Sequence, residues 1–164
     1  MSTSVQESGS YPADPAAVFA LVTDPQFRAD SARAQGATGV EADVTSEGDD
    51  TVVTIIRDEP AAGVPDFIGK FIGSTVKVKQ VETWGPADAE GGRTASVRVK
   101  IIGQPAELTG TATLVADSGT TTLSLDGQVT VSVPFLGRKI EPEIAKIIAA
   151  SLRHDITAGA ERLA

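Results

Sequence analysis

Four consecutive segments in the second half of the chain alternate apolar and polar residues with a period of two. They span about residues 75–84, 93–102, 106–117 and 120–133, and the turns between them are short. A parallel return needs a crossover of about a dozen residues, so these segments predict antiparallel strands. An antiparallel sheet with one apolar face needs a cover. The next segment, at about 139–163, has a helical period and enough apolar surface to provide it.

The first third of the chain begins with a weakly alternating strand and two helix starts. The strand is expected at residues 4–11. Asp14-Pro15 and Asp24-Pro25 each combine a good N-cap with a proline suited to the first helical position. These pairs predict two short helices after the first strand.

The middle of the chain predicts a hairpin and a short insertion. Residues 38–56 alternate on both sides of a turn at 46–49. Residues 64–73, "VPDFIGKFIG", suit a short helix or an ordered loop. The expected order is one strand, two short helices, six strands with a helical insertion, and one long helix, all in a single domain over residues 1–164.

The last strand and the last helix are joined without a spacer. The strand pattern ends at Val133-Pro134, and Gly137 is expected to form the corner. Glu141 and Pro142 are expected to begin the helix.

Charge and composition exclude several classes of function. Fourteen basic and 22 acidic side chains give a net charge of -8, which opposes binding to nucleic acid. It also disfavours docking on anionic lipid, with Arg138-Lys139 as a local exception. The chain has no cysteine, so disulfides, thiolate nucleophiles and cysteine zinc sites are excluded. No signal-like start or membrane-spanning apolar run is evident, and we expect a cytoplasmic protein that is a monomer or weak dimer and has no integral membrane association.

Three stretches carry a resemblance to a known superfamily. They are "GSYPADPAAVFALVTDP" near the start, "VKVKQVETW" in the middle and "VPFLGRKIEPEIAKII" near the end. The chain resembles the START-like, birch-pollen-allergen-like (SRPBCC, helix-grip) superfamily, and is most similar to an uncharacterised bacterial family within it. The resemblance implies an α+β helix-grip fold, with a seven-stranded curved antiparallel sheet wrapped around a long C-terminal helix and a ligand cavity between them.

The strand alternation predicts which side chains face that cavity. Lys77 and Lys79 mark the solvent face of their strand, so Gln80 and Glu82 point inward. Small residues on the inward face either let the sheet bend or leave space for a ligand. In the same way the aromatic residues of 64–73 form either a lid or a satellite core. The candidate cavity residues are Phe67, Phe71, Val78, Gln80, Glu82, Trp84, Val99, Gly110, Ala112, Gly127, Ile144, Ile148, Leu152 and Asp155.

Asp155 is the sharpest anomaly, because a helical wheel places it between Ile144 and Ile148 on the apolar side of the last helix. A buried unpaired carboxylate would cost several kcal/mol, so a partner, a water molecule or a place at the cavity mouth is required. Arg57 and Gln80 are the candidate partners. A structural ion pair or hydrogen bond, a contact to ligand, and catalysis are the open alternatives.

The chain contains residue types found in catalytic and metal sites, but not with the arrangement that those sites need. Ser151, His154 and Asp155 contain the residue types of a catalytic triad, but His154 and Asp155 diverge on the helical wheel. The acidic stretches lack the spacing of a calcium loop, and the glycines form no dinucleotide or phosphate loop. We therefore expect no metal, no cofactor and no assigned catalytic residue.

These observations favour noncatalytic binding of a hydrophobic or amphipathic small molecule, such as a lipid, polyketide or isoprenoid. The alternative is an enzyme of the cyclase, dehydratase or isomerase type in which burial raises the pKa of Glu82 or Asp155 and makes it a general base. A protein-interaction domain is the third possibility.

Overall fold

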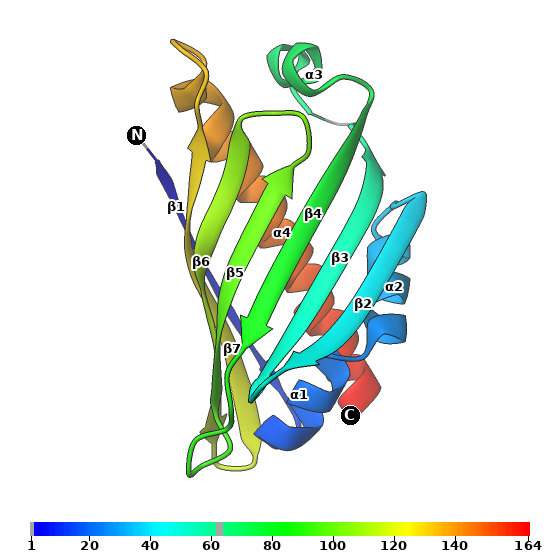
Figure 1. Cartoon of the computed structure of the whole chain (residues 1–164), viewed down its shortest axis with the longest axis vertical. Coiled ribbons are helices and arrows are strands. Elements are labelled where there is room, and N and C mark those ends of the chain that lie inside the picture. Colours follow the sequence, from blue (N-terminus) through cyan, green and yellow to red (C-terminus); the bar gives the residue numbers. More distant parts are fainter. Residues whose placement is uncertain (1, 62–63) are drawn as a thin grey trace.

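The computed structural model describes residues 2–61 and 64–164, and its centre is a curved seven-stranded sheet (Figure 1). The strand order is β1-β7-β6-β5-β4-β3-β2, and every neighbouring pair is antiparallel. The strands are β1 (Thr3–Tyr11), β2 (Gly39–Glu47), β3 (Asp50–Pro60), β4 (Thr75–Trp84), β5 (Arg93–Ile101), β6 (Ala106–Asp117) and β7 (Thr120–Val131).

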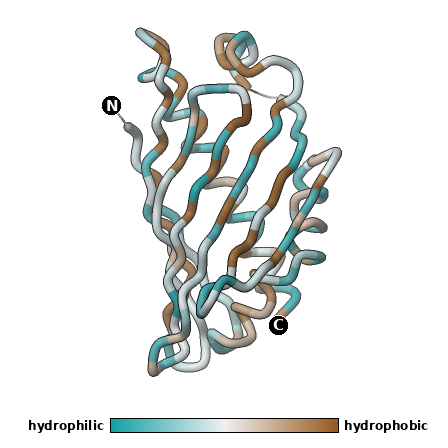
Figure 2. The backbone as a smooth tube through the Cα atoms, in the orientation of Figure 1, coloured by the Kyte–Doolittle hydropathy of each residue, from teal (hydrophilic) through white to brown (hydrophobic). Residues whose placement is uncertain are grey.

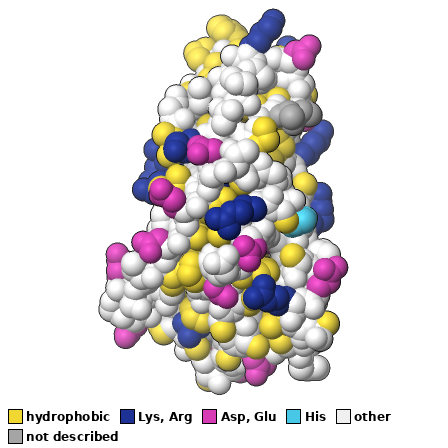
Figure 3. Space-filling view, turned by 90° about the vertical axis from the view of Figure 1, so that its right-hand side faces the viewer, with side chains coloured by type: hydrophobic (Ala, Val, Ile, Leu, Met, Phe, Trp, Pro, Cys, Tyr) yellow, Lys and Arg dark blue, Asp and Glu magenta, His cyan; other side chains and the backbone are white. Residues whose placement is uncertain are grey.

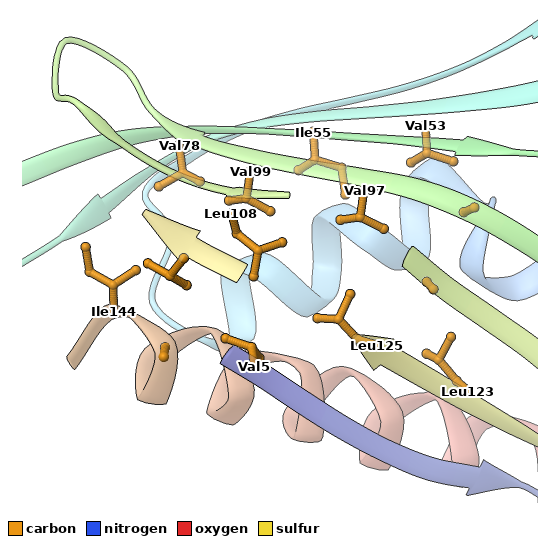
Figure 4. Packing of buried hydrophobic residues seen from close by; sticks show 14 of the residues in the cluster. Val5, Val53, Ile55, Val78, Val97, Val99, Leu108, Leu123, Leu125 and Ile144 are labelled. Atoms are coloured by element: carbon orange, nitrogen blue, oxygen red, sulfur yellow. The ribbon is translucent and has the colours of Figure 1, made fainter. Parts of the chain in front are cut away.

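The predicted strand register is confirmed. Along β4, Val78, Glu82 and Trp84 are buried, whereas Lys77 and Lys79 are exposed. Figure 2 shows this alternation as hydrophobic and hydrophilic residues following one another along the central strands. The inward side chains of the sheet form the core against the final helix; Figure 4 labels several of them, together with Ile144 of the helix.

The long helix α4 (Gly137–Leu163) lies across the concave face of the sheet (Figure 1). It begins two residues earlier than expected, and Pro142 lies inside it. The corner also differs from the expectation, because the left-handed backbone conformation belongs to Phe135 (φ 67°) and Gly137 is already helical. Glu141 is buried and accepts a hydrogen bond from the backbone N–H of Val131 at 2.9 Å, which holds the start of the helix against the end of β7.

Helices α1 (Pro15–Val22) and α2 (Pro25–Ala34) follow β1 as predicted. Both predicted caps are present: Asp14 accepts a hydrogen bond from the N–H of Ala17 and Asp24 from that of Gln26, each at 2.9 Å. A third short helix, α3 (Asp66–Ile72), lies at the opposite end of the sheet (Figure 1). Within the described residues, no helix combines the length and hydropathy needed to cross a membrane.

Candidate ligand-binding cavity

The larger cavity lies between α4, α3 and the adjoining ends of β3, β4 and β5, and has a volume of about 600 Å³. Its walls are mostly aliphatic. The apolar lining includes Val64, Ile68, Ile72, Val76, Val78, Val99, Ile101, Ile144, Ile147 and Ile148. Exposed residues at its edge, such as Pro65, Lys146 and His154, show that this outer cavity reaches the surface. The face in Figure 3 carries hydrophobic side chains between basic and acidic ones.

A smaller cavity of about 80 Å³ lies between the sheet and α4, next to α1 and α2. Its apolar walls are Val22, Phe27, Trp84, Val97, Ala112, Leu123, Leu125 and Leu152. Arg57, Ile148 and Ser151 line both cavities. This inner cavity therefore adjoins the outer cavity at a junction that carries one aliphatic and two polar side chains.

A buried ion pair between Arg28 of α2 and Glu82 of β4 forms one wall of the inner cavity. Arg28 Nη1 and Nη2 donate to the two carboxylate oxygens of Glu82 at 3.0 and 2.6 Å. Trp84 Nε1 and Gln80 Nε2 also donate to this carboxylate, at 3.0 and 2.6 Å. Each carboxylate oxygen of Glu82 thus accepts two hydrogen bonds, so the charge of Glu82 is neutralised and solvated by the protein itself.

This geometry determines the pKa of Glu82. Burial alone would raise the pKa of the carboxyl group, but the charge of Arg28 and the hydrogen bonds from Arg28, Trp84 and Gln80 outweigh it and hold the pKa below its usual value. The same partnership raises the pKa of Arg28 against the opposing effect of burial. The expectation that burial raises the pKa of Glu82 is therefore wrong. The ion pair with Arg28 reverses the shift, and the sequence alone did not reveal this partner.

Arg57 of β3 lies at the junction of the two cavities. Its Nε donates to Glu59 at 2.5 Å and its Nη1 to Gln80 at 3.2 Å. Within the described part of the chain its Nη2 makes no side-chain hydrogen bond. Arg57 can therefore still donate to an oxygen of a molecule in the cavity.

Asp155 is half-buried on α4 and has partners within the protein, although not the expected ones. Its Oδ1 accepts hydrogen bonds from Ser31 Oγ at 2.5 Å and Gln35 Nε2 at 2.9 Å. Both partners belong to α2 or the residue that caps it, so neither Arg57 nor Gln80 satisfies this carboxylate. The hydrogen bonds tie α4 to α2 and hold the carboxylate at the edge of the inner cavity.

Tyr11 completes the polar part of the inner cavity. It is 1% exposed and lines the cavity at the end of β1. Burial, reinforced by the charge of Asp155, raises the pKa of the Tyr11 phenol, so this hydroxyl keeps its proton and remains a hydrogen-bond donor.

The candidate residues from the sequence fall into three groups. The inner cavity is lined by Gln80, Glu82, Trp84, Ala112, Ile148, Leu152 and Asp155. The outer cavity is lined by Val78, Val99, Ile144 and Ile148. The third group, which lies outside the linings of both cavities, consists of Phe67, Phe71, Gly110 and Gly127.

The residues of the third group lie on α3 or in the backbone contact between β6 and β7. Ile68 and Ile72 turn to the outer cavity from α3, while Phe67 is 39% exposed and Phe71 packs at the edge of the core. Gly110 and Gly127 face each other across β6 and β7, and a Cβ on Gly110 would lie 2.5 Å from the carbonyl oxygen of Asp126. These two glycines allow close backbone approach.

The sequence interpretation missed four polar residues of the site: Tyr11, Arg28, Ser31 and Gln35. Three of them lie on or next to α2 at i, i+3 and i+7, which is one face of a helix. A helical wheel of residues 25–35 would have grouped them. It would not have shown that this face meets Glu82 and Asp155.

The curved antiparallel sheet, the helix across its concave face and the cavities between them define the helix-grip fold of START-like proteins. More specifically, the chain belongs to the family described as "Protein of unknown function (DUF2505)", whose model matches residues 6–163.

Solved structures show the same fold at low sequence identity. A START superfamily protein from Mycobacterium smegmatis has a TM-score of 0.56 and 14% identity, covering 98% of this chain and 96% of its own. The Zhui aromatase/cyclase from a Streptomyces species has a TM-score of 0.66 and 12% identity, covering 99% and 94%.

Curated relatives include uncharacterised proteins of Mycobacterium tuberculosis and Mycobacterium bovis. Each is 32% identical over 98 residues, which cover 57% of this chain and 56% of the relative. The match thus spans little more than half the length of these relatives.

Proposed function

We propose that this protein binds a hydrophobic or amphipathic small molecule in the cavity between the sheet and α4, without catalysing a reaction. The outer cavity carries the proposal, because its volume of about 600 Å³ lies within the range of about 300 to 1,000 Å³ for small-molecule sites. A ligand that fills this cavity removes its aliphatic walls from water, which favours binding of an apolar molecule. A lipid, polyketide or isoprenoid has the matching chemistry.

The polar groups at the junction favour an amphipathic ligand over a pure hydrocarbon. Among the described residues no side chain accepts a hydrogen bond from Arg57 Nη2, and Ser151 and Asp155 Oδ2 add further hydrogen-bonding capacity. A ligand with a carbonyl or hydroxyl group at one end could place that group here and its apolar part in the outer cavity. A few polar groups in a mostly apolar pocket are typical of such orientation.

The alternative is an enzyme of the cyclase, dehydratase or isomerase type, and one similar structure is named an aromatase/cyclase. Glu82 is poorly suited to be the base, since its carboxylate is engaged by Arg28, Trp84 and Gln80. Asp155 is the remaining candidate. A protein-interaction domain ranks third. We further propose that the protein acts in the cytoplasm as a monomer or weak dimer and needs no cofactor to bind its ligand.

Native mass spectrometry after gentle purification and displacement of a fluorescent fatty acid test the binding proposal. Val78→Phe places a ring in the outer cavity, and we expect it to weaken probe affinity at least about tenfold, which corresponds to 1.4 kcal/mol. Val81→Phe is the matched control, because Val81 lies on the same strand but on its outer face. It should leave affinity unchanged.

The proposal fails if the wild-type protein neither carries a copurified ligand nor releases the probe to a broad panel of lipids, polyketides and isoprenoids. Equal loss of affinity in the two variants would also contradict it. Conversion of a panel compound to a product of different mass, abolished by Asp155→Asn, would favour the enzyme.

A further inference from the structure

Three connections that are distant in sequence meet at one end of the molecule. Antiparallel pairing sets Pro60 opposite Thr75, Ile101 opposite Ala106, and Ala106 opposite Val131. Helix α3, the β5–β6 turn and the β7–α4 connection therefore lie at the same end, at the top of Figure 1. The outer cavity lies directly below α3.

This end carries exposed large hydrophobic side chains on all three connections. We define the apolar tip as Phe67 of α3, Ile102 of the β5–β6 turn, and Phe135 and Leu136 of the β7–α4 connection. These residues are 39%, 47%, 98% and 40% exposed, respectively. Figure 3 shows hydrophobic side chains at this end beside a basic and an acidic one.

Phe135 is the most unusual member of the tip. It is 98% exposed and has a φ of 67°, in the left-handed region that residues with a β-carbon rarely adopt. Neither packing within the chain nor backbone preference accounts for a phenylalanine here. Contact with an apolar medium outside the protein would account for it.

The charges around the tip point to the nature of that medium. Lys70, Arg138 and Lys139 lie on α3 and at the start of α4. They take part in none of the ion pairs found in the described residues. The turns at the opposite end contain Asp49, Asp88 and Glu90 and no lysine or arginine. The strand ends beside these turns carry Glu47, Asp50 and Asp117, with Arg93 as the one basic residue. In a chain with a net charge of -8, three basic groups outside these ion pairs thus lie beside the exposed apolar side chains.

We propose that the apolar tip is a docking surface for an anionic lipid bilayer. Separate loops that each present one or two apolar side chains suit a fluid surface, into which each side chain can insert independently. The basic groups can meet lipid phosphates at the interface, while the acidic turns point away from the bilayer. Docking in this orientation sets α3 and the adjoining edge of the outer cavity close to the lipid. An amphipathic ligand would then have a short path between the bilayer and the outer cavity.

Flotation with vesicles tests the docking surface without any need to identify the ligand. The vesicles contain phosphatidylcholine alone or phosphatidylcholine with phosphatidylglycerol. Wild-type protein should float with the anionic vesicles, and binding should weaken as salt is raised. Phe135→Asn removes the ring and retains a residue that tolerates positive φ, so the fold is preserved and vesicle affinity should fall about tenfold.

Matched variants separate the tip from general changes in hydrophobicity and charge. Val115→Asn removes an exposed valine near the opposite end of β6 and should leave vesicle binding unchanged. Arg138→Gln with Lys139→Gln should weaken anionic binding by about 25-fold, at about fivefold per charge. Arg33→Gln with Lys79→Gln removes the same charge elsewhere and should have a much smaller effect.

Several results would overturn the proposal. One is the absence of wild-type protein from floated anionic vesicles. Another is an equal loss of vesicle affinity in Phe135→Asn and Val115→Asn. A wild-type dimer that Phe135→Asn converts to a monomer, with no vesicle binding by either, would assign the tip to self-association. Probe displacement in solution should be unchanged in Phe135→Asn, so failure of docking and failure of ligand binding are distinguishable.

Discussion

At the scale of single residues, the contact between Arg28 and Glu82 explains how a carboxylate can occupy the inward face of a sheet. The two side chains are 10% and 7% exposed, so both charges have lost most of their water. Removing one partner from such a pair leaves an uncompensated buried charge, which is far more costly than removing both. The bond from Arg28 Nη1 to the carbonyl oxygen of Val22 at 3.0 Å also anchors α2 to the end of α1.

Arg28→Met should therefore lower the free energy of unfolding by about 3 to 5 kcal/mol. The double variant Arg28→Met/Glu82→Met should be more stable than Arg28→Met alone, because no unpaired carboxylate remains. Urea denaturation of the three proteins at neutral pH measures both differences.

The control is Arg33→Met, which breaks the exposed Arg33–Asp30 pair. It should change the free energy of unfolding by no more than about 0.5 kcal/mol. If Arg28→Met were as stable as this control, the ion pair would not be a determinant of stability.

At the scale of elements, α4 packs closely at its C-terminal end and more openly in its middle. Gly159 brings the helix so near to the first part of the chain that an added Cβ would lie 2.7 Å from the ring of Tyr11. Ile148, Ser151 and Leu152 in the middle stay half-buried because they face the cavities. One helix thus serves as a packed anchor at one end and a cavity wall further along.

Two glycine-to-alanine substitutions in helices test this difference. Gly159→Ala should destabilise the protein by about 1 to 3 kcal/mol through overpacking against the rigid Tyr11 ring. Gly69→Ala in α3 meets no atom within 4 Å, so it should be neutral or stabilise the protein by up to about 1 kcal/mol through helix propensity. Thermal unfolding compares the two, and a shift of the same sign in both would contradict the packing assignment.

At the scale of the whole molecule, the Arg28–Glu82 pair links α2 to the centre of the sheet, since α2 bonds to β4 and β4 pairs with β3 and β5. Its contribution to stability depends on pH. The pKa of Glu82 in the folded protein lies below its usual value, so the unfolded chain takes up the proton first as the pH falls. The contribution is therefore complete above the unfolded pKa of about 4.3 and is lost as pH falls through the folded pKa.

Glu82→Gln should remove this pH dependence. The difference in unfolding free energy between wild type and Glu82→Gln should be largest at neutral pH and should shrink as the pH falls below about 4. Urea denaturation between pH 7 and pH 3 measures it. Glu47→Gln, at the exposed end of β2, should show no such change, and a constant difference for Glu82→Gln would contradict the assigned shift.

The sequence by itself determined most of the fold, because the relevant signals are local. The period of two along β4 to β7 assigned the inward face correctly, and the two Asp-Pro pairs marked α1 and α2. The boundary between β7 and α4 was less accurate: the helix begins at Gly137, and Phe135 makes the turn. Local propensity favours glycine for such a turn, whereas the packing of Gly137 against β7 required the turn to come earlier.

Only the tertiary structure decided which polar groups meet. Asp155 was correctly identified as lying on the apolar side of its helix, yet its partners Ser31 and Gln35 lie more than a hundred residues away in sequence. Arg28 and Glu82 are 54 residues apart, and their contact reverses the expected direction of the Glu82 pKa shift. Periodicity reports which way a side chain points within its own element. Hydrogen bonds and ion pairs depend on where α2 packs against the sheet and α4, and that position is set by contacts across the whole chain.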